Sequence, residues 1–126
     1  MITITPLDQL GMDERGGTYT FDTDRTGPYM VTHRRAGSAS GRHFHHGVSP
    51  KKNPEHLILM KGTVQVNWKN MRGPESGSVH VEAPARIVIP AWVWHEVIAE
   101  TDFVMLELNG PEDGREDTYR DVARQV

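Results

Sequence analysis

The chain has 126 residues, the size of a single domain that buries roughly two thirds of its unfolded surface. It contains no cysteine, which excludes disulfides, zinc–thiolate sites and cysteine nucleophiles, so any metal must be held by histidine, carboxylate or water. A formal charge of −3 without a basic patch excludes a typical nucleic-acid partner. No apolar run approaches a membrane span and no leader pattern precedes the first strand, so we expect a soluble, cytoplasmic protein without a membrane partner.

In chain order, short segments of alternating apolar and polar residues predict strands. They cover residues 1–12, 18–21, 29–35, 43–45, 57–60, 63–69, 79–81, 87–89, a segment around 97, and 103–108. A polar loop spans 46–54, and a charged tail at 111–126 is compatible with a helix. Many short strands without a long helix predict an all-β jelly roll, a single domain over 1–126 with its core at about 15–110.

Two histidines in one predicted strand indicate a metal site. His43 and His45 alternate with Phe44 and therefore point to the same face. Glu55 opens an apolar strand, where a carboxylate is costly unless it is paired or bound to a metal. His95 follows a proline turn at the start of another strand, which is a suitable place for a fourth ligand.

The choice of acidic ligand depends on the register of one strand. Glu55 and His56 face opposite sides, so only one of them can join the paired histidines. Glu55 shares its face with Leu57 and Leu59, the expected core side, and we therefore predict Glu55, with His56 as the alternative. His46 points away from its neighbour, and we expect a supporting role for it rather than ligation.

These segments resemble the cupin superfamily, whose first motif is His-x-His followed by Glu-x6-Gly and whose second is Pro-x-Gly-x-x-His. Here the first motif matches His43, His45 and Glu55, with six residues before Gly62. The second matches Pro90 and His95, five residues apart. The gap of nine residues between His45 and Glu55 is longer than the family usually has, which implies an extended loop beside the pocket. Trp92 replaces the glycine of the second motif.

Within that superfamily the sequence is similar to two sugar-handling groups. The segments Glu55–Leu57 and Gly62–Val64, together with 107–110 and 116–120, resemble type II phosphomannose isomerase domains. The segments 13–16, His43 with His45, and 94–96 resemble nucleotide-sugar ketoisomerases and epimerases. Both resemblances imply a small-molecule substrate that is a sugar derivative.

Two classes of function follow. The first is a metal-dependent isomerase or epimerase acting on a phosphorylated or nucleotide-linked sugar, with one divalent ion (Fe, Mn, Ni, Co or Zn) on His43, His45, Glu55 and His95. A cupin-type dioxygenase would use the same ligands, and a ketoisomerase-like enzyme would use the histidines without metal as proton shuttles. The second class is a non-enzymatic module that binds a sugar or a small acid. Polar groups in the pocket beyond the ligands would favour catalysis.

The sequence leaves two further points as expectations. The general base in an isomerase could be His46, His56 or Glu96. Ile58 and Met60 face away from the predicted core side of their strand, and a covered outer face predicts a homodimer.

Overall fold

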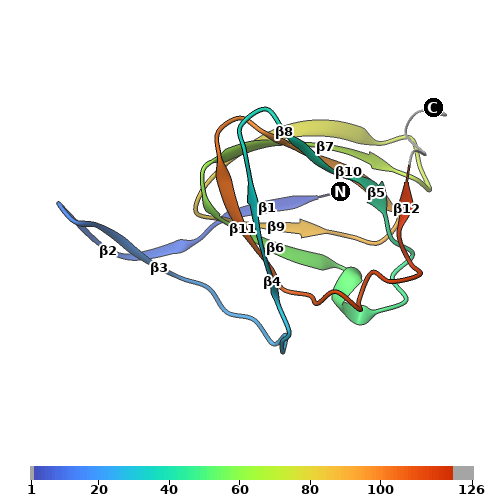
Figure 1. Ribbon diagram of the computed structural model, residues 1–126, viewed down its shortest axis with the longest axis horizontal. Coiled ribbons are helices and arrows are strands. Elements are labelled where there is room, and N and C mark those ends of the chain that lie inside the picture. The colour runs from blue at the N-terminus through green and yellow to red at the C-terminus, as the bar shows by residue number, and fades with distance from the viewer. Residues whose placement is uncertain (1, 121–126) are drawn as a thin grey trace.

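The computed structural model describes residues 2–120, and its regular structure is nearly all antiparallel strands, most of them in two stacked sheets. One sheet has the order β1 (Thr3–Pro6), β9 (Ala85–Ile89), β6 (Glu55–Lys61), β11 (Phe103–Glu107) and β4 (Met30–Arg34). The other has the order β12 (Tyr119–Arg120), β5 (Ala39–Phe44), β10 (Val93–Ala99), β7 (Thr63–Asn70) and β8 (Ser76–Glu82). This arrangement confirms the predicted all-β jelly roll, in the form of an open sandwich (Figure 1).

Two smaller elements lie outside the sheets. The hairpin of β2 (Asp8–Asp13) and β3 (Gly16–Thr20) extends away from the body of the molecule (Figure 1). The loop that precedes β6 contains one turn of 3-10 helix, η1 (Pro50–Lys52). No helix among residues 2–120 has the length and apolar character needed to cross a bilayer.

The core forms between the facing sheets from the side chains that alternate inward. Leu57 and Leu59 of β6 pack in one cluster with Val64 and Val66 of β7, so the predicted register of β6 is confirmed. β6 joins β7 at Gly62, whose φ of +93° places it in the left-handed region. A Cβ at this position would lie 2.2 Å from a backbone oxygen, so only glycine fits the turn.

Both ends of the described chain contribute strands beyond the predicted core of 15–110. β1 pairs with β9, and β12 pairs with the end of β5. The described part of the predicted tail, 111–120, forms turns and the short strand β12 rather than a helix. The remaining tail residues, 121–126, lie outside the described residues.

The outer face of β6 is partly covered by the same chain. Ile58 is fully buried, and the segment between β3 and β4 lies beside the start of this strand. Arg25 in that segment donates hydrogen bonds to the carbonyls of Lys51 and Pro54, at 2.9 and 2.7 Å. Ile58 therefore does not offer the exposed surface from which the homodimer was predicted, whereas Met60 is 52 % exposed.

The homodimer stays a prediction, with Met60 as part of the surface that a second copy would cover. Light scattering at micromolar concentration should give the mass of two chains, and Met60→Asp should shift the population toward the monomer, because a charge would be buried in the interface. Val48→Asp, at a side chain that is 80 % exposed, is the control. A wild-type protein that is monomeric would contradict the prediction.

Candidate active site

A bulge in β5 sets the positions of two site histidines. The pairing of β5 with β10 shifts between His95 and Glu96, so that Arg42 is an extra residue and His43 lies directly opposite His95. Gly41 and Arg42 have φ values of +80° and +60°, the left-handed conformation that such a bulge requires. The bulge thus places His43 across from His95.

Three imidazoles converge on the inner face of this sheet. The ring centroid of His43 lies 4.8 Å from that of His45 and 4.8 Å from that of His95. The His45 and His95 centroids are 6.0 Å apart. One nitrogen from each ring lies within 4.8 Å of the others. Because His45 and His95 are buried, their polar atoms need partners inside the protein.

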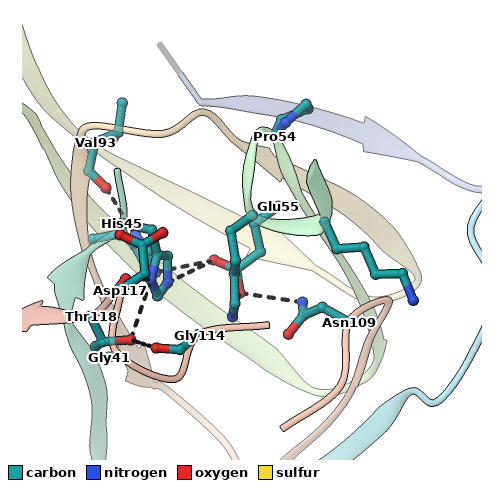
Figure 2. Close-up of polar contacts among 12 residues, drawn as sticks. Gly41, His45, Pro54, Glu55, Val93, Asn109, Gly114, Asp117 and Thr118 are labelled. Carbon is teal, nitrogen blue, oxygen red and sulfur yellow. Dashed lines mark hydrogen bonds and ion pairs between the residues drawn. The ribbon is translucent and has the colours of Figure 1, made fainter. Parts of the chain in front are cut away.

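Glu55 completes the cluster from the opposite sheet. Its Oε1 lies 3.6 Å from Nε2 of both His45 and His95. Its Oε2 accepts a hydrogen bond of 3.0 Å from Nζ of Lys52 and one of 3.4 Å from the Asn109 amide. Figure 2 shows Glu55 between His45 and Asn109. The carboxylate is only 3 % exposed, so both sheets contribute to one interior polar cluster.

Backbone carbonyls determine which nitrogen of each imidazole faces the cluster. Nδ1 of His45 lies 2.8 Å from the Asp117 carbonyl, and Nδ1 of His95 lies 3.0 Å from the Val93 carbonyl. A carbonyl oxygen only accepts, so each Nδ1 carries the proton. In a neutral ring Nε2 then presents a lone pair, and two such lone pairs face the Oε1 of Glu55.

This arrangement of acceptors fits a cation. Among the described residues, Nε2 of His45, Oε1 of Glu55 and Nδ1 of His43 are buried without a hydrogen-bond partner. Acceptors that face one another without a donor are unfavourable in a buried site. Histidines whose second nitrogen donates to a carbonyl, together with a carboxylate, form the donor set of divalent transition metals.

Burial shapes the ionisation of this cluster. It lowers the pKa of His43 to about 3, an effect reinforced by the neighbouring His95 and His45 rings. Burial also lowers the pKa of His45. For Glu55, burial alone would raise the pKa, but the surrounding His95, Lys52 and His45 outweigh it and hold the carboxyl ionised. Neutral imidazoles beside an ionised carboxylate are the forms that ligate metals.

The cluster opens into a pocket of about 350 Å³ between the sheets. Polar side chains other than the four candidate ligands also line this pocket: Thr32, Arg34, Ser40, Glu107 and Arg120. The Thr32 hydroxyl donates a 2.5 Å hydrogen bond to Glu107 on the neighbouring strand. Within residues 2–120, Arg34 donates to the Ser40 hydroxyl at 3.1 Å and to the His33 carbonyl at 2.9 Å, and Arg120 donates to the Gly41 carbonyl at 3.1 Å.

The structure places His46 outside this pocket. Its ring stacks between Trp92 and Tyr119, with centroids 3.9 and 4.0 Å away and interplanar angles of 10° and 15°. Trp92 adopts a φ of +64° at the position where the family motif has glycine. The backbone N–H of Trp92 donates a hydrogen bond of 2.7 Å to the His45 carbonyl. This bond and the ring stack together hold the end of β5 next to the site.

His56 and Glu96 also lie away from the cluster. His56 is on the face of β6 opposite Glu55, and its pKa is lowered by burial and by the nearby Arg25 and Arg86. Glu96 is on the face of β10 opposite His95, and its carboxylate binds Arg42 at 2.6 Å and the Asn67 amide at 2.8 Å. Neither residue lines the pocket.

Asp117, in the predicted tail, is a supporting residue that the sequence did not indicate. Its carboxylate accepts backbone N–H bonds from His46, Gly47 and Val48 at 2.9 to 3.0 Å, and its carbonyl holds His45. The residue is only 2 % exposed. Burial would raise the pKa of Asp117, but the three N–H donors outweigh it and lower that pKa. The segment after β11 therefore anchors the loop that follows the paired histidines.

Comparisons with known proteins identify the fold. No family model matches the chain, and no curated protein is detectably similar in sequence. A sugar 3,4-ketoisomerase from Thermoanaerobacterium thermosaccharolyticum, solved with TDP, superposes with a TM-score of 0.72 at 16 % identity, over 98 % of this chain and 90 % of its own. The 3,4-ketoisomerase of Helicobacter canadensis gives 0.70 at 17 % identity, over 98 and 92 %.

A third structure extends this comparison. The dTDP-4-dehydrorhamnose 3,5-epimerase of Bacillus anthracis, with TDP and pyrophosphate bound, gives a TM-score of 0.65 at 16 % identity, over 84 % of this chain and 70 % of its own. At such identities the likeness shows the fold alone. The chain thus has the cupin-type jelly roll that these nucleotide-sugar enzymes share.

The buried imidazole of His43 predicts a pH dependence of stability. The unfolded ring binds a proton below about 6.5, but the folded ring does so only near 3, so protonation favours unfolding. Lowering the pH from about 6.5 should therefore reduce the free energy of unfolding of the metal-free protein, by up to about 1.4 kcal/mol per pH unit from this group. Denaturant titrations across this range measure the slope.

Two variants test whether the His43 imidazole causes this slope of unfolding free energy against pH. His43→Gln should make it shallower. His80→Gln should not, because the hydrogen bonds that the His80 ring makes to the Glu82 and Glu100 carboxylates raise the pKa of His80, so that its protonation favours the folded state. A free energy of unfolding that stays constant or rises as the pH falls from 6.5 to about 5 would contradict the assigned burial.

Removal of the Asp117 carboxylate should destabilise the protein. Asp117→Ala leaves three backbone N–H groups without their acceptor, and the loss in free energy of unfolding should be at least about 2 kcal/mol. Glu112→Ala, which removes an exposed carboxylate from the same segment, is the matched control and should change stability little. Equal effects of the two substitutions in denaturant titrations would show that the tail does not anchor the loop.

Proposed function

We propose that this protein is a metal-dependent isomerase or epimerase acting on a phosphorylated or nucleotide-linked sugar. The proposal rests on one observation, the cluster in which ring nitrogens of His43, His45 and His95 lie within 4.8 Å of one another and Oε1 of Glu55 faces Nε2 of both His45 and His95, with no hydrogen-bond donor for Oε1 among residues 2–120. A divalent ion held by these residues would polarise a sugar carbonyl and its neighbouring hydroxyl. Fe, Mn, Ni, Co and Zn all suit this donor set.

The pocket also offers a carboxylate for proton transfer. Glu107 lines the pocket on β11, and Thr32 donates a hydrogen bond to its Oε2. A carboxylate that lines a substrate pocket can remove a proton from the carbon next to a carbonyl. Glu107 is therefore our proposed base, in place of His46, His56 and Glu96, which lie outside this pocket.

The charge at the pocket supports an anionic substrate. Arg34 and Arg120 come from edge strands of the two different sheets and line the same pocket. Arginine binds phosphate oxygens through several N–H donors, so the pair suits a phosphate or diphosphate group. The solved structures of similar fold that contain TDP support the same substrate class.

Polar groups beyond the four ligands favour proton-transfer chemistry over a pocket that only binds. A dioxygenase would use the same ligands but does not call for a carboxylate and two arginines around them. A binding module would retain the sugar without converting it. Both remain outcomes of the experiment that tests the proposal.

The experiment measures deuterium incorporation at the carbon next to the carbonyl. Nucleotide-diphosphate keto-sugars in D₂O should exchange that proton, detected by NMR, in the presence of metal-loaded protein. His95→Ala should abolish the exchange with loss of metal. Glu107→Gln should slow it by about 10²- to 10⁴-fold while the metal stays bound. A rate of deuterium exchange in Glu107→Gln equal to that of the wild type would exclude Glu107 as the base.

Other results would reject the proposed activity. A fully metal-loaded protein that exchanges no proton with any sugar of this class would contradict it. Consumption of oxygen with a substrate of another class would assign the site to a dioxygenase. Sugar binding without exchange would assign it to a binding module.

A further inference from the structure

Lys52 is a buried lysine next to the proposed metal site. It ends the turn η1 in the long loop between His45 and Glu55, and only 6 % of the residue is exposed. Lysine is almost never buried unless its charge is paired. The side chain lies against Gly114 of the segment after β11, where a Cβ would come within 3.3 Å of its Cε. The lysine is therefore enclosed by two loops beside the cluster.

The ammonium of Lys52 occupies one of the two oxygens of Glu55. Nζ lies 3.0 Å from Oε2, whereas Oε1 faces the imidazoles of His45 and His95 at 3.6 Å. Asn109 adds a long hydrogen bond to the same Oε2. One oxygen of the carboxylate is thus held by the Lys52 ammonium, and the other is presented to the imidazoles.

The nearby acidic groups do not take Lys52 away from Glu55. Asp113 lies close enough to interact with its charge, but the Asp113 carboxylate accepts from the Ser49 hydroxyl at 2.6 Å and from the Gly110 N–H at 2.7 Å. Within the described residues, the ion pair of Lys52 is with Glu55. A buried charge pair of this kind strongly affects any third charge placed beside it.

We propose that Lys52 is a built-in counter-ion that keeps the four-residue cluster assembled without metal and weakens its affinity for divalent ions. The inference rests on the proposed metal site. With the imidazoles in the neutral form that ligates a metal, the Glu55 carboxylate and the Lys52 ammonium sum to zero charge, whereas the same cluster without Lys52 carries a charge of −1. The neutral cluster, with Lys52, holds a divalent ion less strongly than the cluster of charge −1. The centre with its metal then has a net charge of +2.

The net charge of the metal-loaded centre determines how strongly it attracts an anionic group in the pocket. A centre with a net charge of +2 attracts an anionic oxygen more strongly than a centre whose charge is reduced by an unpaired carboxylate. Lys52 would therefore lower metal affinity while it strengthens the electrostatic stabilisation of negative charge in the pocket. Its position in the loop before Glu55 gives the unusual length of that loop a physical role.

The experiment compares Co²⁺ affinity and thermal stability in Lys52→Met. Competition with a chelator should show at least about tenfold tighter Co²⁺ binding, because the repelling charge is gone. The melting temperature of the metal-free variant should fall by at least about 5 °C, since Glu55 loses its partner. The Co²⁺-loaded variant should melt within about 2 °C of the wild type, because the metal replaces the lost charge.

Two control variants separate charge from packing. Lys51→Met removes a charge from the same turn, but the Lys51 ammonium donates to the Thr26 carbonyl rather than to Glu55. Neither the affinity for Co²⁺ nor the metal-induced shift in melting temperature should therefore change in this variant. Lys52→Arg keeps the charge and should retain affinity close to that of the wild type.

Three results would overturn the inference. Equal destabilisation of the metal-free and loaded forms of Lys52→Met would reduce Lys52 to a structural ion pair. Unchanged or weaker Co²⁺ binding by that variant, with stoichiometric binding by the wild type, would reject the counter-ion role but leave the proposed function in place. A wild-type protein that binds less than about 0.2 Co²⁺ per chain would reject both.

Discussion

The buried carboxylate of Glu55 is the constraint on which the rest of the site depends. An ionised carboxylate inside a protein is stable only when positive or hydrogen-bonding groups surround it. Lys52 and Asn109 hold one oxygen, and His45 and His95 face the other. The long loop before β6 and the segment after β11 are both needed to supply these partners, so the loops of this small sandwich are as much part of the site as its strands.

A second layer of contacts fixes the histidines around that carboxylate. The carbonyls of Asp117 and Val93 select the tautomers of His45 and His95, and the bulge at Arg42 sets His43 opposite His95. Such outer contacts orient ligands and tune the groups they hold. The pocket beyond the cluster carries the other polar groups, and this division separates the residues that would hold a cation from those that would handle a sugar.

Much of the fold and of the candidate cluster could be predicted, because both follow strand alternation. The period of two placed His43 beside His45 and placed Glu55 with Leu57 and Leu59, as the structure has them. Lys52 and Asp117 could not be predicted, since they reach the site from irregular loops in which no periodicity indicates direction. Strand alternation also does not predict the burial of Ile58 on the outer face of β6. Glu107 ends a nearly continuous apolar strand, in which no alternation assigns its side chain to the pocket.

X-ray absorption at the cobalt edge of the Co²⁺-reconstituted protein tests the central claim most directly, because it reports the atoms bound to the metal. We expect one Co²⁺ per chain, bound to three imidazole nitrogens and a carboxylate oxygen from His43, His45, His95 and Glu55. The imidazole scattering should weaken by one ring in His95→Ala and stay unchanged in His56→Ala. A spectrum without imidazole scattering, or with the same scattering in wild type and His95→Ala, would contradict it.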